Sequence, residues 1–174
     1  MHSDRLWMPF NFVNANSFRV MKPMNKAFVR EPDADVRVLC PKCGSPGRAV
    51  GNGPIEVYVR PESRAQLLNA AWCCGNAACS VVYFNMFEQF VRAADLLASV
   101  YPYDLNAPIC ACFGFTYGDV DDDARDPQPL RIRDLLAKSK SVDARCSSLA
   151  VDGQCCMREI QRLYRLLRSE NHFP

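Results

Sequence analysis

The stretch Cys74-Gly-Asn-Ala-Ala-Cys79-Ser-Val-Val-Tyr-Phe84 joins a tight turn that carries two cysteines to a short run of strand-forming residues. A second cysteine turn, Cys40-Pro-Lys-Cys43, lies earlier in the chain and is followed directly by a glycine, which lets backbone amides approach the thiolates. Two such turns are typical of a site in which four thiolates surround one Zn²⁺. The sequence therefore predicts a zinc site with four ligands: Cys40, Cys43, Cys74 and Cys79.

Two alternatives remain open at this first site. Cys73 stands beside Cys74, and spacing alone does not say which of the two faces the metal. The cysteines could also be buried free thiols or form a disulfide. A site with four protein ligands has no open coordination position, so we expect zinc to be structural here and not catalytic.

A second group of cysteines follows in the last third of the chain: Cys110-Ala-Cys112, then Cys146, then the Cys155-Cys156 pair. Several soft thiolates that converge from distant loops suit an iron–sulfur cluster. Helix starts close to these loops would favour the negative charge of such a cluster. A second zinc site is the main alternative, because four thiolates also bind zinc well.

Composition narrows the protein class. The chain has 174 residues, 49% of them hydrophobic, and ten cysteines. Residues 1–30 lack the unbroken apolar stretch of a signal peptide, so we expect a reducing, cytoplasmic location with thiolate ligands in place of disulfides. No segment has the length and hydropathy of a membrane span. A net charge of +2 gives no basis for nucleic-acid binding.

Local patterns predict an α+β fold with a small strand-rich zinc lobe followed by a helical lobe made of helix-turn-helix pieces. We expect three regions: an irregular arm over 1–36, a zinc-binding lobe and connector over 37–107, and a helical cluster-binding lobe over 108–174. Strands are predicted over 36–39, 55–59 and 81–84, and a solvated turn over 121–129. Helices are predicted over 61–71, after Thr116, over 130–140 and over 157–169, whereas the state of 85–100 is left open.

Three segments together resemble one family: Pro108-Ile-Cys-Ala-Cys-Phe-Gly-Phe-Thr116, the stretch from Cys146 to Gly153-Gln-Cys-Cys-Met157, and Cys79-Ser-Val-Val-Tyr-Phe84. They are similar to the N-terminal domain of CopZ-type copper chaperones, over Cys40 to about Ile160. In that family the domain pairs a mononuclear zinc site with a [2Fe-2S] cluster, whose part of the fold is similar to bacterioferritin-associated ferredoxin. The resemblance implies four cluster ligands: Cys110, Cys112, Cys146 and Cys156, with Cys155 as the alternative to Cys156.

This chain departs from the family pattern at two places. Ala144 stands where the family often has a further cysteine, and Ala150-Val151 stands where it often has Asn-Pro. The copper-binding module with its Met-x-Cys-x-x-Cys loop, which follows in full-length chaperones, does not occur in this sequence. We therefore do not expect this chain to deliver copper by itself.

The resemblance implies one-electron transfer by a [2Fe-2S] cluster, linked to the handling or reduction of copper, with a redox protein or a copper-handling protein as the partner. The sequence offers no paired carboxylates or nucleophile–base pairs, and His2 and His172 lie in the terminal segments, so we expect an electron carrier and no enzyme with its own substrate site. A metal-stabilised binding or scaffold module and a redox sensor are the alternatives. The arginines of 157–169 could steer an acidic partner or form a solvated face.

Overall fold

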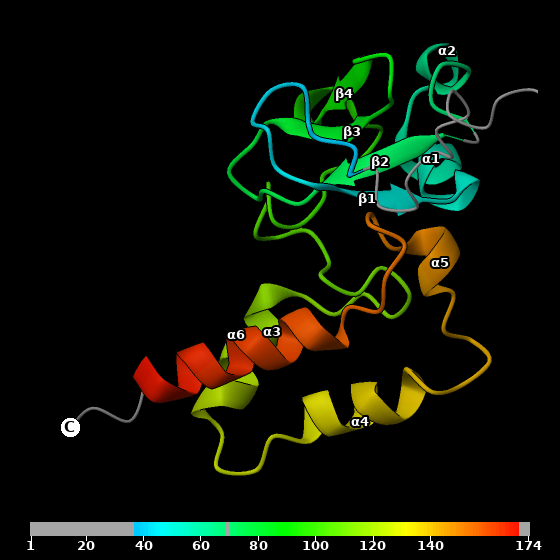
Figure 1. The fold of residues 1–174 in the computed structure, drawn as a ribbon. Coiled ribbons are helices and arrows are strands. Elements are labelled where there is room, and N and C mark those ends of the chain that lie inside the picture. The colour runs from blue at the N-terminus through cyan, green and yellow to red at the C-terminus, as the bar shows by residue number, and fades with distance from the viewer. Residues whose placement is uncertain (1–36, 69, 171–174) are drawn as a thin grey trace, which may run out of the picture. The chain divides into compact units, whose positions relative to one another are not determined.

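The computed structural model describes residues 37–68 and 70–170, and their fold is drawn in Figure 1. A strand-rich lobe is followed by a helical C-terminal part, which confirms the predicted α+β class. The arm expected over 1–36 lies outside the described residues. The elements of the first lobe are β1 (Gly47–Val50), α1 (Asn52–Tyr58), α2 (Pro61–Arg64), β2 (Ala71–Cys74), β3 (Val81–Phe84), β4 (Phe90–Arg92) and the 3₁₀ helix η2 (Ala93–Asp95).

The four strands form one antiparallel sheet in the order β1-β2-β3-β4. β3 is buried along its whole length, as the predicted strand over 81–84 requires. Across the first three strands, Arg48 pairs with Cys73 and Cys73 pairs with Tyr83. These three residues form a row on one face of the sheet, because directly opposed residues share a face. Cys74, the next residue after Cys73, points to the other face.

The strand predicted over 55–59 is wrong, because this segment forms the end of α1 and its C-cap. The run Ile-Glu-Val-Tyr-Val alternates with a period of two, but Ile55, Tyr58 and Val59 also lie at the spacing of one helix face. These three residues are at most 8% exposed, whereas Val57, which would share a strand face with Ile55, is 40% exposed. Burial of the helical face against the rest of the lobe decides the conformation.

Two neighbouring predictions are corrected in part. The helix expected over 61–71 begins at Pro61 but ends at Arg64, and its expected last residue, Ala71, instead belongs to β2 as the partner of Val50. Residues 37–39 contain no full strand, and Leu39 forms an isolated bridge with Pro46. The segment 85–100, left open by the sequence, contains β4 and η2.

The helical part contains α3 (Tyr117–Arg125), α4 (Leu130–Lys138), α5 (Cys146–Leu149) and α6 (Met157–Glu170). The predicted start after Thr116 is confirmed as a capping box with Asp119. The helices predicted over 130–140 and 157–169 are confirmed as α4 and α6. Met157, Ile160 and Leu163 form the buried face of α6.

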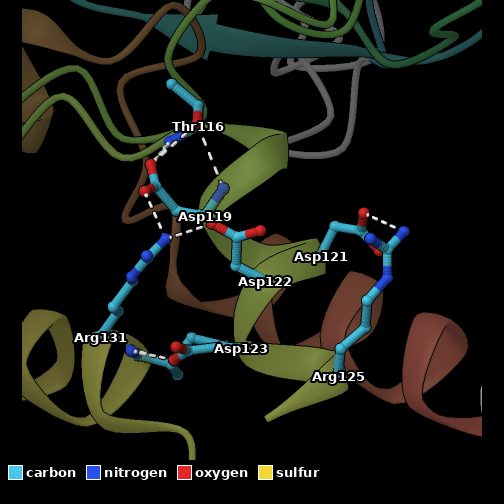
Figure 2. Close-up of polar contacts among 8 residues, drawn as sticks. Thr116, Asp119, Asp121, Asp122, Asp123, Arg125 and Arg131 are labelled. Carbon is cyan, nitrogen blue, oxygen red and sulfur yellow. Dashed lines mark hydrogen bonds and ion pairs between the residues drawn. The ribbon is translucent and has the colours of Figure 1, made fainter.

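The turn predicted over 121–129 is wrong for its first half, because Asp121–Arg125 continue α3. Asp123 is only 3% exposed, and its carboxylate accepts a hydrogen bond of 2.7 Å from the backbone N–H of Ile132 (Figure 2). The N-cap position of α4 is Pro129, which has no side-chain acceptor, so Asp123 caps α4 from the neighbouring helix. Arg131 adds ion pairs to Asp119 and Asp122 on the same side of α3 (Figure 2).

Each part has its own hydrophobic core. The core of the first lobe is centred on Ile55, Leu67 and Tyr83, and the core of the helical part on Val120, Leu135 and Ile160. None of the helices in the described part of the chain is long and apolar enough to cross a bilayer.

Candidate metal centre

The four cysteines predicted to bind zinc converge beside the sheet, with Cys74 at the end of β2 and Cys79 just before β3. Their sulfur atoms all lie within 4.8 Å of one another, and in the described part of the chain they are the one group of three or more metal-ligating side chains this compact. The group comprises Cys40, Cys43, Cys74 and Cys79.

The spacing of these sulfurs matches a tetrahedral zinc site. A Zn–S bond of about 2.3 Å places two sulfurs of a regular tetrahedron about 3.8 Å apart. The Cys40 and Cys79 sulfurs are 3.9 Å apart, and the Cys43 and Cys74 sulfurs are 3.6 Å apart. Cys43 is exposed and the other three are buried, so the site lies at the surface of a small apolar cluster with Val81 and Phe84.

Backbone geometry in the first turn sets the direction of two of the sulfurs. The N–H of Gly44 donates to the carbonyl of Cys40, and the N–H of Cys40 donates to the carbonyl of Ser45, both at 2.9 Å. Gly44 has a φ of 68°, a conformation that glycine adopts without the steric cost of a side chain. The turn therefore closes tightly enough to bring Cys40 and Cys43 to one side.

Hydrogen bonds stabilise the thiolate form at one of the four ligands. The side chain and the backbone N–H of Ser45 donate to the Cys43 sulfur and lower the pKa of Cys43 to about 6. Burial raises the pKa of Cys74 and of Cys79. At neutral pH Cys43 is thus a thiolate, whereas burial keeps Cys74 and Cys79 protonated, and a bound divalent cation would supply the charge that deprotonates them.

The structure distinguishes the two adjacent cysteines of β2. Cys74 lies 3.6 Å from the sulfur of Cys43, whereas Cys73 points to the opposite sheet face and packs against the core that contains Tyr83. Burial raises the pKa of Cys73 to about 12, so its thiol stays protonated. Cys73 therefore takes no part in the four-sulfur group.

The second group of cysteines lies in the helical part. The loop from Cys110 closes through hydrogen bonds from the backbone N–H groups of Ile109 and Cys110 to the carbonyl of Phe115. Cys156 directly precedes α6, and its carbonyl accepts the N–H of Ile160. Cys146 is the first residue of α5.

Within this group the structure brings the sulfurs together in pairs. The Cys112 and Cys146 sulfurs are 3.9 Å apart, again the separation expected for two thiolates on one metal ion. A hydrogen bond from the Cys156 thiol, with weaker bonds from the backbone N–H groups of Phe113 and Cys112, lowers the pKa of Cys110 to about 6. Cys112 thus lies beside Cys146, and Cys110 beside Cys156, while the side chain of Cys112 also hydrogen-bonds to Cys110.

Cys155 remains at the margin of this second group. Its side chain is exposed, whereas Cys156 packs against the helical core. Cys155 contacts Cys146. Burial is the main cause that raises the pKa of Cys146 to about 12, and its hydrogen bond with Cys112 is the second cause. Cys156 is therefore the better placed of the two neighbours to pair with Cys110.

Sequence reasoning missed the groups that support these sulfurs. The donor to Cys43 is Ser45, and the backbone N–H of Val81 lies 3.5 Å from the Cys79 sulfur. Both stand two residues after a cysteine, so the turn pattern itself contained the signal. Tyr58 was missed because it lies far from Cys112 in the sequence. The two are close in the fold, since the Cys112 charge is the second cause, after burial, that raises the pKa of Tyr58. His2 and His172 lie outside the described residues.

Comparisons with known proteins agree with this geometry. The family model zf_CopZ, described as a zinc binding domain, matches residues 37–96. The X-ray structure of the Archaeoglobus fulgidus CopZ N-terminal domain matches with a TM-score of 0.61 and 22% sequence identity, and the match covers 72% of this chain and 97% of that one. No curated protein matches the chain. The chain therefore shares the fold of that domain, and a CopZ-type zinc-binding domain over residues 37–96 is supported by both the family match and the four convergent thiols.

Proposed function

We propose that this chain is a one-electron transfer protein that holds a [2Fe-2S] cluster and a structural zinc ion and acts in metal handling. The zinc ligands would be Cys40, Cys43, Cys74 and Cys79. The cluster ligands would be Cys110, Cys112, Cys146 and Cys156.

The observation that carries the proposal is the pairing of sulfurs in the second group. A mononuclear ion needs all four sulfurs mutually close, as in the first group. A dinuclear cluster takes one pair of thiolates on each iron, so the two pairs stand further apart. The four sulfurs of the second group are not all this close, and the 3.9 Å contact of Cys112 with Cys146 and the hydrogen bond from Cys156 to Cys110 favour the dinuclear group over a second zinc ion.

The surrounding residues suit an anionic redox centre. A [2Fe-2S] cluster accepts and returns one electron at a potential set by hydrogen bonds to its sulfurs and by its exposure to solvent. The backbone N–H groups of Cys112 and Phe113 donate to the Cys110 sulfur and would stabilise negative charge there. Cys110 is 2% exposed and Phe115 is 8% exposed, so one side of the group is shielded from water.

The likeness to the CopZ N-terminal domain supports a copper-handling protein as the partner, and a ferredoxin-like role for the helical part follows from the same proposal. On α6 the charges are already partly balanced, because Arg162 donates two hydrogen bonds to Glu159. Arg158 and Arg165 are exposed on the same helix and would supply the attraction for an acidic partner. A cytoplasmic location remains a prediction.

Metal analysis with spectroscopy tests the proposal. Protein purified without oxygen, or reconstituted with iron and sulfide, should contain about two irons and about one zinc per chain and give a paramagnetic signal on reduction with dithionite. Cys112→Ser should lose the iron and its colour but keep the zinc, whereas Cys73→Ser should keep both metals. Zinc alone, without colour after reconstitution, would refute electron transfer and favour a metal-stabilised binding module.

A further inference from the structure

The segment between the two later cysteine ligands is held by the strand-rich lobe. Cys146 and Cys156 are separated by α5 and a loop. Residues 148–152 of this stretch contact α1 and the strands β1 and β3. Figure 1 shows α5 beside α1, which belongs to the zinc lobe. The position of the second thiol of each proposed pair therefore depends on contacts outside the helical part.

The first contact is a close approach of two helices. A Cβ atom on Gly53 would lie 2.6 Å from the Cα atom of Ser148, so only glycine lets α1 and α5 come this near. Five residues further along α1, the hydroxyl of Tyr58 donates a 2.7 Å hydrogen bond to the backbone carbonyl of Leu149. The two contacts place the end of α5 against α1.

The next contacts come from the row of residues across the sheet. Tyr83 is completely buried, and its hydroxyl donates a 2.7 Å hydrogen bond to the carbonyl of Val151. Arg48 forms an ion pair with Asp152. Cys73 stands between Arg48 and Tyr83 in the row. It lies close enough to Asp152 for the carboxylate charge to add to the effect of burial in raising the pKa of the Cys73 thiol.

The opposite face of the same strands carries the proposed zinc ligands. Cys74 follows Cys73 in β2, and Phe84, which packs against the zinc-site cysteines, follows Tyr83 in β3. Successive residues of a strand point to opposite faces, so the sheet links the zinc site on one face to residues 148–152 on the other. Ordering of these strands by zinc also orders the residues that hold the segment.

We propose that the zinc lobe positions the cluster ligands Cys146 and Cys156, with Tyr58 and Tyr83 as the positioning residues, so that occupancy of the zinc site controls affinity for the cluster. The effect on cluster affinity rests on the proposed function, whereas the contacts of the zinc lobe with residues 148–152 do not. Coupling between two binding sites is reciprocal, so the bound cluster raises the affinity for zinc by the same factor by which zinc raises the affinity for the cluster.

Hydrogen exchange on zinc-loaded, cluster-free protein tests the geometry directly. Removing one buried hydrogen bond should speed amide exchange in residues 146–156 about fivefold, and the double variant Tyr58→Phe/Tyr83→Phe should speed it about thirtyfold. Tyr103→Phe is the matched control, because its hydroxyl donates to the carbonyl of Val81 within the zinc lobe. The control should leave exchange in residues 146–156 unchanged.

A second measurement uses the reconstituted protein. Iron should leave the double variant to a chelator about thirtyfold faster than it leaves the wild type, and the paramagnetic signal should change shape, while zinc content stays at the wild-type level. Extraction of zinc from the wild type should likewise remove the protection of residues 146–156.

The outcomes separate this inference from the proposed function. Equal exchange in the double variant and in Tyr103→Phe would overturn the inference, whether or not a cluster forms. Failure of the wild type to take up iron would refute the proposed function, and the exchange comparison would still decide whether the zinc lobe holds the segment. Protection that survives zinc extraction would also overturn the inference.

Discussion

Two adjacent cysteines of β2 should respond in opposite ways to the same substitution. Cys74→Ala removes a sulfur that lies 3.6 Å from that of Cys43, so three sulfurs remain at the proposed zinc site. Cys73→Ala removes a sulfur that packs in the core on the other sheet face. The two variants share the strand, the residue type and the number of atoms removed, so each serves as the control for the other.

The expected magnitudes differ enough to decide the assignment. Binding of structural zinc contributes about 10–16 kcal/mol to the folding of zinc-finger peptides, which is as large as the roughly 5–15 kcal/mol that separates most folded proteins from the unfolded state. Cys74→Ala should therefore cost most of the stability of the zinc lobe. Cys73→Ala should cost about 1 kcal/mol and lower the melting temperature by roughly 2–8 °C.

Zinc content after gel filtration and thermal unfolding followed by circular dichroism would measure both effects. We expect Cys73→Ala to retain about one zinc per chain and a single cooperative transition. We expect Cys74→Ala to lose zinc and the sheet signal together. Full zinc content in Cys74→Ala, or its loss in Cys73→Ala, would refute the assignment of the ligand to the Cys74 face of the strand.

Three further predictions concern the helical part and are checked by urea unfolding. Thr116→Ala should lower the free energy of unfolding by about 1 kcal/mol. Hydrogen bonds from Thr116 and the Arg131 charge outweigh burial and lower the pKa of Asp119, so the Asp119 carboxylate stabilises the fold above about pH 4 and loses this effect as the pH falls. The variant should therefore lose less stability on acidification than the wild type. Ile160→Ala should cost about 2–5 kcal/mol at a fully buried position, whereas Leu166→Ala, 46% exposed on the same helix, should cost less than about 0.5 kcal/mol. Asp123→Ala should cost about 1–3 kcal/mol by leaving the amide that it caps without a partner, and a cost near zero would contradict that role.

Elements with a complete local signal were predicted correctly. The hydroxyl of Thr116 and the carboxylate of Asp119 form their capping box within four residues, so no distant partner is needed. α6 has its apolar residues at helical spacing, and its apolar face is buried as that spacing predicts. The run Val81–Phe84 is apolar throughout and becomes the buried strand β3.

Segments with an ambiguous period needed their tertiary partners. Residues 55–59 fit both a strand and a helix face, and the contact of α1 with α5, which Gly53 permits, lies far away in sequence. Acidic residues 121–123 look solvated in isolation, yet Asp123 is buried because α4 offers it an unpaired backbone N–H. In both cases the deciding interaction joins residues that no local pattern connects.

Local patterns were enough to predict two groups of cysteines and an α+β fold, because turn spacing, strand composition and helix capping are local properties. Packing of the whole chain settles that Cys74 and not Cys73 joins the four-sulfur group, since that choice depends on which sheet face is buried against the 148–152 segment. It also decided the pairing of Cys112 with Cys146, whose sulfurs come within 3.9 Å only after the helical part has packed. Distances between side chains far apart in sequence arise from packing, and packing is a property of the whole fold.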